Sequence, residues 1–208
     1  QKNGTVYKGN DPAVRYTGRT LVSPDGSVAF DWVGTYLETR FTGGKLSVKV
    51  SETGTSYYNV FVDGKLHKVV KVCGTDTLIH LVSGIDKRIH SLKIQKRSEG
   101  EFGKTTVHQF VLSGSGRLAE EPAVRTRHIE FIGNSLTCGY GTDGKHRDEP
   151  FLVETENCNL TFASMVARYY DADYTLIAHS GRGAARNYGD SVRVSKVTMK
   201  DRMLNTFD

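Results

Sequence analysis

The sequence predicts an all-β sandwich in its first half and an α/β unit in its second half. Residues 1 to about 120 contain eight or so short runs of alternating apolar and polar residues, separated by Gly and Asp turns and with no helical stretch. Beyond that point an apolar strand, a helical pattern and a second strand follow in the order that is typical of an α/β fold.

The alternating runs are the expected strands of the sandwich. Asp63-Gly64 lies between two of them and predicts a tight hairpin, because both positions of such a turn favour positive φ. Cys73 follows the run at 68–72 and is predicted to be a buried thiol. The runs cover residues 27–33, 36–41, 45–50, 58–62, 68–72, 77–81, 89–95 and 106–112.

A change of composition at residues 114–122 predicts a linker, so we expect a sandwich domain at 1–120 and an α/β domain at 121–208. In the second domain we predict strands at 129–132 and 174–178, joined by a helix at 159–170 through a right-handed crossover. We expect the apolar stripe of that helix to face the core; it consists of Leu160, Phe162, Met165, Val166 and Tyr169.

The α/β part offers too few elements for a complete domain. A parallel sheet needs several strands with helices on both faces. Residues 122–208 supply two strands, one helix and one further amphipathic candidate at Val192 to Leu204. We therefore expect the front portion of a longer α/β domain, whose remainder was cut away, lies on another chain or is missing from this sequence.

The composition argues against two classes of protein. No window of the 208 residues approaches the roughly 20 apolar residues that a membrane span needs. The net charge of +5 comes from scattered Lys and Arg rather than a run, so we do not expect a nucleic-acid interface. The chain begins at Gln1 with no Met and no apolar signal region, which fits a mature exported protein, secreted or periplasmic, or a trimmed chain.

The strongest functional signal is the stretch from His128 to Tyr140. A short buried strand ends at Gly133, and Asn134 and Ser135 follow where a strand should turn into a helix. Ser135 would thus lie at the carboxyl edge of a sheet, where α/β folds place their chemistry. The same Gly-Asn-Ser pattern is also typical of a helix N-cap, and spacing alone leaves both interpretations open.

Two blocks of sequence around this turn resemble a known family. Gly133-Asn134-Ser135-Leu136-Thr137-Cys138-Gly139-Tyr140-Gly141 resembles the first block of the SGNH (GDSL-type) hydrolases, and most closely the secreted carbohydrate esterases of family 2, which include acetyl xylan esterases. Those enzymes usually carry Asp where this chain has Asn134. The second block is similar to Ala178-His179-Ser180-Gly181-Arg182-Gly183 together with Arg186-Asn187-Tyr188-Gly189-Asp190.

The N-terminal half resembles the jelly roll of the same family. The similarity is carried by Tyr16-Thr17-Gly18-Arg19, Phe30-Asp31-Trp32-Val33-Gly34 and Asn59-Val60-Phe61-Val62-Asp63-Gly64. The resemblance implies a jelly-roll sandwich followed by an incomplete α/β domain of the SGNH, flavodoxin-like three-layer type. Trp32 is either a sugar-stacking platform or an aromatic of the sandwich core.

Ester cleavage needs an activated nucleophile and donors aimed at the developing oxyanion. Ser135 would supply the nucleophile and, through its N–H, one donor. The Gly181-Arg182-Gly183 turn could supply a second donor, because glycine leaves room for the substrate carbonyl; the family's second block favours Gly183 over Gly181. The alternative is a tight turn without catalytic duty.

Other parts of the expected site are weaker. Asn134, Arg182 and Tyr188 are candidates for substrate binding, although structural pairing is the expected role of Arg182 and of Arg186. The resemblance implies a further oxyanion Asn and a catalytic His from later blocks, and neither can be matched here. The only histidines near enough in sequence to replace that base are His146, which is expected to be solvated, and His179, which is expected to shape the pocket wall.

The resemblance predicts a serine esterase that removes O-acetyl groups from polysaccharides such as xylan or mannan through an acyl-enzyme on Ser135. Its expected partners are an acetylated polysaccharide or oligosaccharide and the remainder of its own hydrolase domain, with no nucleic acid, cofactor or metal. Cys138 and Cys158 flank one loop and are a candidate disulfide pair. Two alternatives remain: a non-catalytic protein whose sandwich binds carbohydrate, and a structural sandwich that docks a partner chain.

Overall fold

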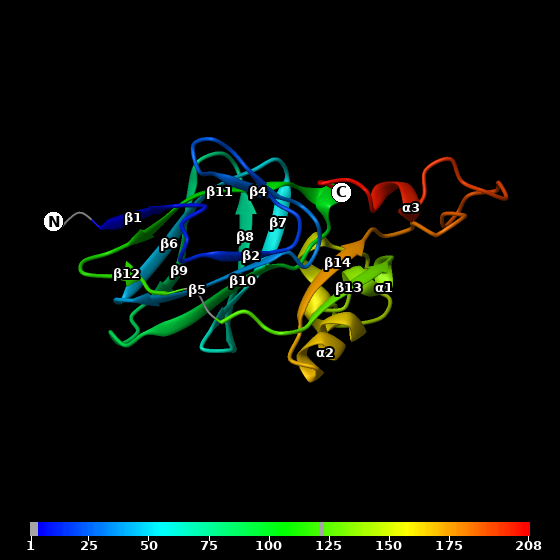
Figure 1. Ribbon diagram of the computed structural model, residues 1–208. Helices are drawn as coiled ribbons and strands as arrows, with labels where there is room; N and C mark the ends of the chain where they lie inside the picture. The colour runs from blue at the N-terminus through cyan, green and yellow to red at the C-terminus, as the bar shows by residue number, and fades with distance from the viewer. Residues whose placement is uncertain (1–3, 121–122) are drawn as a thin grey trace.

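The computed structural model of the chain describes residues 4–120 and 123–208. Two antiparallel sheets form a β-sandwich, and a pair of parallel strands with short helices lies at one end of it (Figure 1). The expected boundary between residues 120 and 121 touches residues outside the described ranges. None of the described helices is long and apolar enough to cross a membrane.

The first sheet has the strand order β3-β4-β11-β6-β9, with β1 also paired to β11. Strands distant in sequence lie side by side in this order. The sheet therefore needs strands from both the beginning and the end of the N-terminal half. Its members are β1 (Thr5–Lys8), β3 (Leu21–Val22), β4 (Val28–Phe30), β6 (Lys45–Glu52), β9 (Thr77–Ser83) and β11 (Thr105–Leu112).

The second sheet has the order β12-β5-β10-β7-β8, with β2 also paired to β5. Asp63 and Gly64 join β7 to β8 with φ of 50° and 77°, which confirms the predicted hairpin turn. The strands are β2 (Arg15–Thr17), β5 (Tyr36–Thr42), β7 (Thr55–Val62), β8 (Lys65–Cys73), β10 (His90–Lys96) and β12 (Arg117–Leu118).

Alternating side chains of the two sheets form the core of the sandwich, as the sequence pattern predicts. Fully buried examples include Phe41, Leu46, Val60, Leu92 and Phe110. Two details of the prediction are wrong at the ends of strands. Cys73 is exposed, because Val72 takes the inward position and the next residue of a strand points outward. The predicted linker contains β12, whose Leu118 packs in the core, so the sandwich extends past residue 114.

The second half contains one parallel pair of strands, β13 (His128–Gly133) and β14 (Asp173–Ala178). Between them lie the short helix α1 (Ser135–Cys138), two 3₁₀ turns, η2 (Val153–Thr155) and η3 (Cys158–Leu160), and the helix α2 (Phe162–Tyr169). The helix α3 (Met199–Arg202) follows β14, and a further 3₁₀ turn, η1 (Gly100–Phe102), follows β10. Both predicted strands and the helix between them are therefore present.

The expected orientation of α2 is wrong. Its buried side consists of Ala163, Ser164 and Ala167, and these small side chains allow the helix to pack closely on the rest of the unit. The large apolar residues that were expected to face the core, Leu160, Phe162, Met165, Val166 and Tyr169, are all exposed. The candidate helix from Val192 to Leu204 is also wrong, since only the four residues of α3 are helical there.

The segment Trp32-Val33-Gly34 forms the apolar contact between the sandwich and the parallel strands. Val33 packs in one cluster with Leu176 and Ala178 of β14, while Trp32 packs in another with Ile177 and Met199. Gly34 has φ of +78°, and a Cβ there would lie 2.6 Å from Leu176 Cδ1. Trp32 is 1% exposed, so it is a core residue rather than a sugar-stacking platform.

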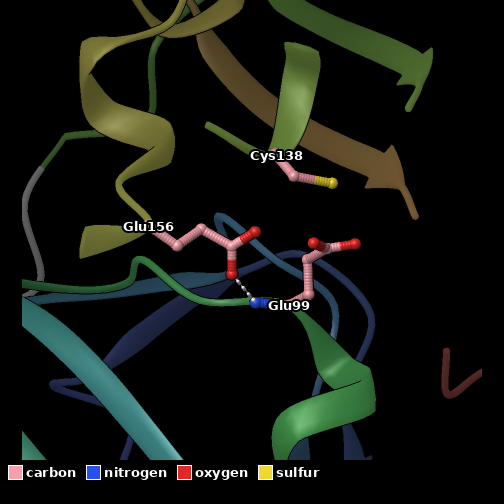
Figure 2. A group of neighbouring side chains, drawn as sticks. All are labelled: Glu99, Cys138 and Glu156. Atoms are coloured by element: carbon pink, nitrogen blue, oxygen red, sulfur yellow. Dashed lines mark hydrogen bonds between the residues drawn. The ribbon is translucent and has the colours of Figure 1, made fainter. Parts of the chain in front are cut away.

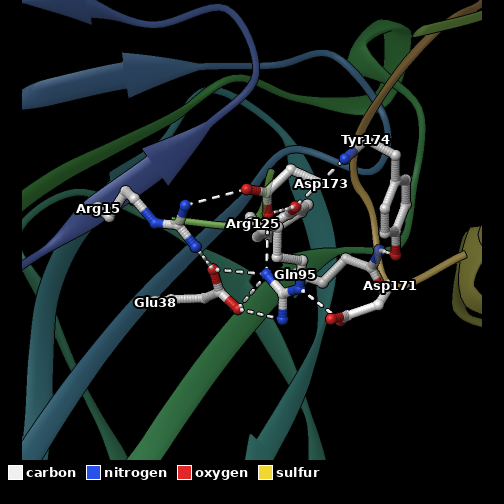
Figure 3. A network of polar contacts seen from close by, with 8 residues as sticks. Arg15, Glu38, Gln95, Arg125, Asp171, Asp173 and Tyr174 are labelled. Atoms are coloured by element: carbon white, nitrogen blue, oxygen red, sulfur yellow. Dashed lines mark hydrogen bonds and ion pairs between the residues drawn. The ribbon is translucent and has the colours of Figure 1, made fainter. Parts of the chain in front are cut away.

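A buried ionic network fixes the start of β14 to the sandwich (Figure 3). Asp173 accepts hydrogen bonds from Arg15 Nη1 at 2.9 Å, Arg125 Nη1 at 2.8 Å and the Tyr36 hydroxyl at 2.6 Å. Both arginines also contact the carboxylate of Glu38. Burial alone would raise the pKa of Asp173, but the Tyr36 hydroxyl and the two guanidinium groups outweigh burial and lower this pKa below its ordinary value.

We expect Asp173→Asn to lower the free energy of unfolding by about 3 kcal/mol, because it removes one charge of a buried ion-pair network. The matched control is Asp171→Asn, which removes a 91% exposed carboxylate that lies 3.4 Å from Arg125 and should change stability by less than about 0.5 kcal/mol. Urea unfolding of both variants measures the difference. Equal effects would show that the network does not hold β14.

The same network gives a pH dependence. Because the pKa of Asp173 is lowered from 3.8, its contribution to stability is complete above that value and is lost as the pH falls through the folded-state pKa. We therefore expect the stability difference between the parent protein and Asp173→Asn to shrink below about pH 4. Unfolding curves at several pH values between neutrality and acid test this, and a difference that stays constant contradicts it.

Candidate functional site

The turn after β13 places Ser135 as the first residue of α1. Asn134 is the N-cap of this helix, and its side-chain oxygen accepts a hydrogen bond from the Leu136 N–H at 3.1 Å. Gly133 is required for a close contact, because a Cβ there would lie 2.0 Å from Thr137 Oγ1. The capping interpretation of the motif is therefore correct for Asn134, and it leaves the Ser135 side chain half-exposed at the carboxyl edge of the strands.

The glycine corner, residues 180–183, follows β14 at the same edge. The parallel register pairs Gly133 with Ala178, so the turns after the two strands are adjacent. Gly181 has φ of +77° and open space around it, whereas a Cβ on Gly183 would lie 2.1 Å from the Arg186 carbonyl oxygen. Glycine at 183 is thus required by the chain's own backbone.

The two turns open into one cleft of about 680 Å³. All six residues that the sequence singled out line it: Asn134, Ser135, Gly181, Arg182, Gly183 and Tyr188. The structure therefore brings the predicted residues together, although it assigns no chemical role to them. Glu101, Tyr140, Ser180 and Arg186 complete the lining.

The two glycine N–H groups differ in availability. The Gly183 N–H donates to the Asn187 side-chain oxygen at 3.2 Å. No hydrogen bond among the described residues uses the Gly181 N–H or the Ser135 N–H. An oxyanion needs donors that are not already occupied, so this geometry favours Gly181, the second choice from the sequence, over Gly183.

Several side chains around the cleft are exposed or form no ion pair with the described residues. Among the described residues neither Arg182 nor Arg186 forms an ion pair, so the structural pairing expected for both is wrong. Tyr188 is 93% exposed. Tyr140 is better supported, because its ring stacks on Phe151 with centroids 3.8 Å apart, and Phe151 also contacts Phe102 of η1.

The histidines differ sharply in their surroundings. His146 is exposed, as expected. His179 is buried, and its Nδ1 lies 2.8 Å from Asp208 Oδ1 while its Nε2 lies 3.3 Å from Glu101 Oε2. Burial, together with the charge of Glu99, raises the pKa of Glu101 above its ordinary value. Both ring nitrogens of His179 are thus engaged by carboxylates, and none of the described residues hydrogen-bonds the Ser135 hydroxyl.

Residues of the sandwich contribute to the cleft, which the sequence did not predict. Arg97 is buried and donates to the carbonyl oxygens of Glu154 and Glu156 and to Asp143 Oδ2 at 2.5 Å, so it organises the loop beneath Tyr140. Glu99 and Glu101 contact Ser180 and His179. These charged residues directly follow a strand, where such a run is ordinarily solvated surface. The sequence offers one signal for them: the alternation of apolar and polar residues in β10 stops at these charged residues, yet no turn motif follows directly.

Glu99, Cys138 and Glu156 are a buried group whose potential metal-ligand atoms all lie within 4.8 Å of one another (Figure 2). Both Glu99 oxygens already accept hydrogen bonds from Ser180. Burial and the neighbouring Glu99 raise the pKa of Glu156 above its ordinary value. The Glu156 carboxyl in turn accepts a hydrogen bond from the Glu99 N–H at 2.8 Å, and we interpret the group as a hydrogen-bonded cluster.

Cys138 and Cys158 do not form the candidate disulfide. Both are free, buried thiols in the cluster that joins α1 and α2 to β14. The Cys158 Sγ–H donates to the Lys96 carbonyl oxygen at 3.4 Å. Burial raises the pKa of both thiols, so neither is a reactive thiolate at neutral pH.

Comparison with known proteins identifies relatives of the chain. The family model described as Carbohydrate esterase 2 N-terminal matches residues 16–122. The Cellulase/esterase CelE of Acetivibrio thermocellus is 34% identical over 180 residues, which is 86% of this chain and 22% of that protein. An acetylxylan esterase / glucomannan deacetylase of Cellvibrio japonicus is 31% identical over 198 residues, which is 92% of this chain and 54% of that protein.

Solved structures of similar proteins share the fold. A family two carbohydrate esterase from Clostridium thermocellum, solved in complex with cellohexaose, has a TM-score of 0.87 at 33% identity and covers 93% of this chain and 58% of its own. One from Cellvibrio japonicus has a TM-score of 0.86 at 24% identity, with coverages of 99% and 60%. This chain thus spans little more than half the length of those structures.

The glycine corner provides a steric prediction. Gly183→Ala should lower the free energy of unfolding by about 2–3 kcal/mol, because its Cβ would force the Arg186 carbonyl to move. Gly181→Ala is the matched comparison; it meets no atom and should cost about 1 kcal/mol from its positive φ. Urea unfolding of the two variants tests the order, and the account fails where Gly181→Ala is the more damaging change.

Proposed function

Because the chain belongs to carbohydrate esterase family 2, we propose that it removes O-acetyl groups from polysaccharides such as xylan or mannan through an acyl-enzyme on Ser135. The observation that carries this proposal is the cleft in which Ser135 lies beside the glycine corner. The substrate class is supported by the relatives of the chain, which include an acetylxylan esterase / glucomannan deacetylase.

In this proposal Ser135 Oγ attacks the acetyl carbonyl carbon, and its proton passes to a base. The N–H groups of Ser135 and Gly181 stabilise the oxyanion of the tetrahedral intermediate. When the intermediate collapses, the bond to the sugar oxygen breaks, and that oxygen takes the proton back. Water then cleaves the acetyl-serine and releases acetate. Asn134, Arg182 and Tyr188 would line the path of the sugar.

The base is the part of the mechanism that these residues do not supply. His179 uses both ring nitrogens on carboxylates, so we propose that the base and a further oxyanion donor come from the part of the family's length that this chain does not span. We further propose that residues 1–120 are the jelly-roll domain and residues 121–208 the first part of an SGNH-type α/β domain. The exposed apolar side chains of α2 would then pack against the remainder of that domain.

We propose that the protein acts outside the cytoplasm, secreted or periplasmic, because a polysaccharide is too large to enter the cell. The alternative, carbohydrate binding by the sandwich alone, has less support. Stacking on sugars needs exposed aromatic rings. Within the described residues the strongly exposed aromatic side chains all lie after residue 123: Tyr140, Phe162, Tyr169, Tyr170 and Tyr188.

The test is acetate release from acetylated xylan and glucomannan by the full-length protein. Ser135→Ala should lower kcat by at least about 10⁴-fold, because no other group replaces the nucleophile. Ser83→Ala, at an exposed position of β9, is the control and should keep the parent rate. Activity that survives in Ser135→Ala rejects the assignment, whereas saturable binding without any acetate release favours the carbohydrate-binding alternative.

A further inference from the structure

The sandwich sends a fully buried polar segment beneath the cleft. Lys96 is the last residue of β10 and is followed by Arg97, Ser98 and Glu99, and each of the four is no more than 2% exposed. Such residues are rarely buried unless every polar atom has a partner. Lys96 Nζ donates to the carbonyl oxygens of Ser98 and Glu99 at 2.8 and 2.9 Å, and these bonds fix the backbone that carries Glu99.

Both carboxylate oxygens of Glu99 accept a hydrogen bond from one residue of the cleft. Its Oε1 accepts from the Ser180 N–H and its Oε2 from the Ser180 hydroxyl, both at 2.5 Å. A carboxylate that accepts two hydrogen bonds from one residue fixes both the position and the orientation of that residue. The peptide bond between Ser180 and Gly181 carries the Gly181 N–H. The two bonds to Ser180 therefore also restrict the position of this N–H.

Glu156 lies beside Glu99 and hydrogen-bonds its backbone (Figure 2). Its Oε2 accepts the Glu99 N–H at 2.8 Å. Its Oε1 is buried and has no hydrogen-bond partner among the described residues. Burial and the adjacent Glu99 raise the pKa of Glu156. A raised pKa favours the neutral form of Glu156, and that form reduces the repulsion between the two carboxyl groups.

We propose that Glu99 is a positioning residue of the esterase site: its carboxylate holds Ser180, and through Ser180 the Gly181 N–H, at the place where the oxyanion of the Ser135 reaction forms. This inference rests on the proposed function of Ser135. It gives the sandwich a part in transition-state stabilisation that is separate from any binding of sugar.

Three variants of the full-length protein test the proposal. Glu99→Gln replaces one of the two acceptor oxygens by an NH₂ group, which cannot accept from Ser180. We expect kcat for acetate release to fall about 100-fold, as for a small displacement of a catalytic group, with KM within about threefold because the lost interaction belongs to the transition state. Ser180→Ala removes one bond of the pair and should lower kcat about tenfold.

Glu156→Gln is the matched control, because the amide has the shape of the neutral acid and carries a donor of its own. It should keep kcat within about threefold of the parent. The proposal is overturned where Glu99→Gln keeps the parent kcat, or where Glu156→Gln loses as much as Glu99→Gln. Thermal unfolding of each variant shows whether lost activity comes from a displaced glycine corner or from loss of the fold. If Glu99→Gln does not fold, the kcat of Ser180→Ala tests the proposal.

Hydrogen–deuterium exchange provides a readout that does not depend on activity. The Ser180 amide is held by Glu99, so exchange in the segment 179–183 should be at least about tenfold faster in Glu99→Gln and unchanged in Glu156→Gln. A parent protein without Ser135-dependent acetate release would reject the proposed function. Unchanged exchange in Glu99→Gln would reject the positioning role, whatever the activity.

Discussion

The position of β14 against the sandwich determines the geometry of the cleft. Sandwich residues hold this strand at both of its ends. At its start, Arg15 and Tyr36 bind the carboxylate of Asp173, and just past its end Glu99 binds Ser180. In between, Gly34 lets the sandwich backbone approach Leu176 so closely that no side chain fits. Because β13 is registered on β14, the same contacts also determine where Ser135 lies.

The fold was predictable where one periodicity dominates. Alternation identified most strands of the sandwich, and Asp63-Gly64 identified a hairpin, because both are local signals. The face of α2 was not predictable in the same way. Its large apolar side chains suggested a core, but close packing on β14 selects the small residues Ala163 and Ala167. Periodicity shows that a helix has two faces, and the tertiary partner decides which face is covered.

The site was predictable to the extent that it follows a local motif. Ser135 and the glycine corner lie at consecutive strand ends, and parallel strands bring such ends together. Glu99 and Glu156 were missed because their roles depend on a contact between segments about 57 residues apart in the chain. A charged residue after a strand is ordinarily solvated. Only the structure shows that the parallel strands and their loops cover this end of the sandwich.

The charge at this junction argues that the sandwich and the parallel strands act as one unit. Glu38, Lys96, Arg97 and Glu99 belong to the sandwich, yet three of the four have partners in the second half. Trp32 and Val33 also pack against apolar residues of that half. Separating the sandwich from the parallel strands would expose apolar surface and leave hydrogen-bonding groups without their partners. Both changes cost free energy. A tethered binding module has a polar, self-sufficient surface towards its neighbour, and this sandwich does not. We therefore regard it as part of the framework of the cleft, so that changes in its buried polar residues should be read as changes in the site itself.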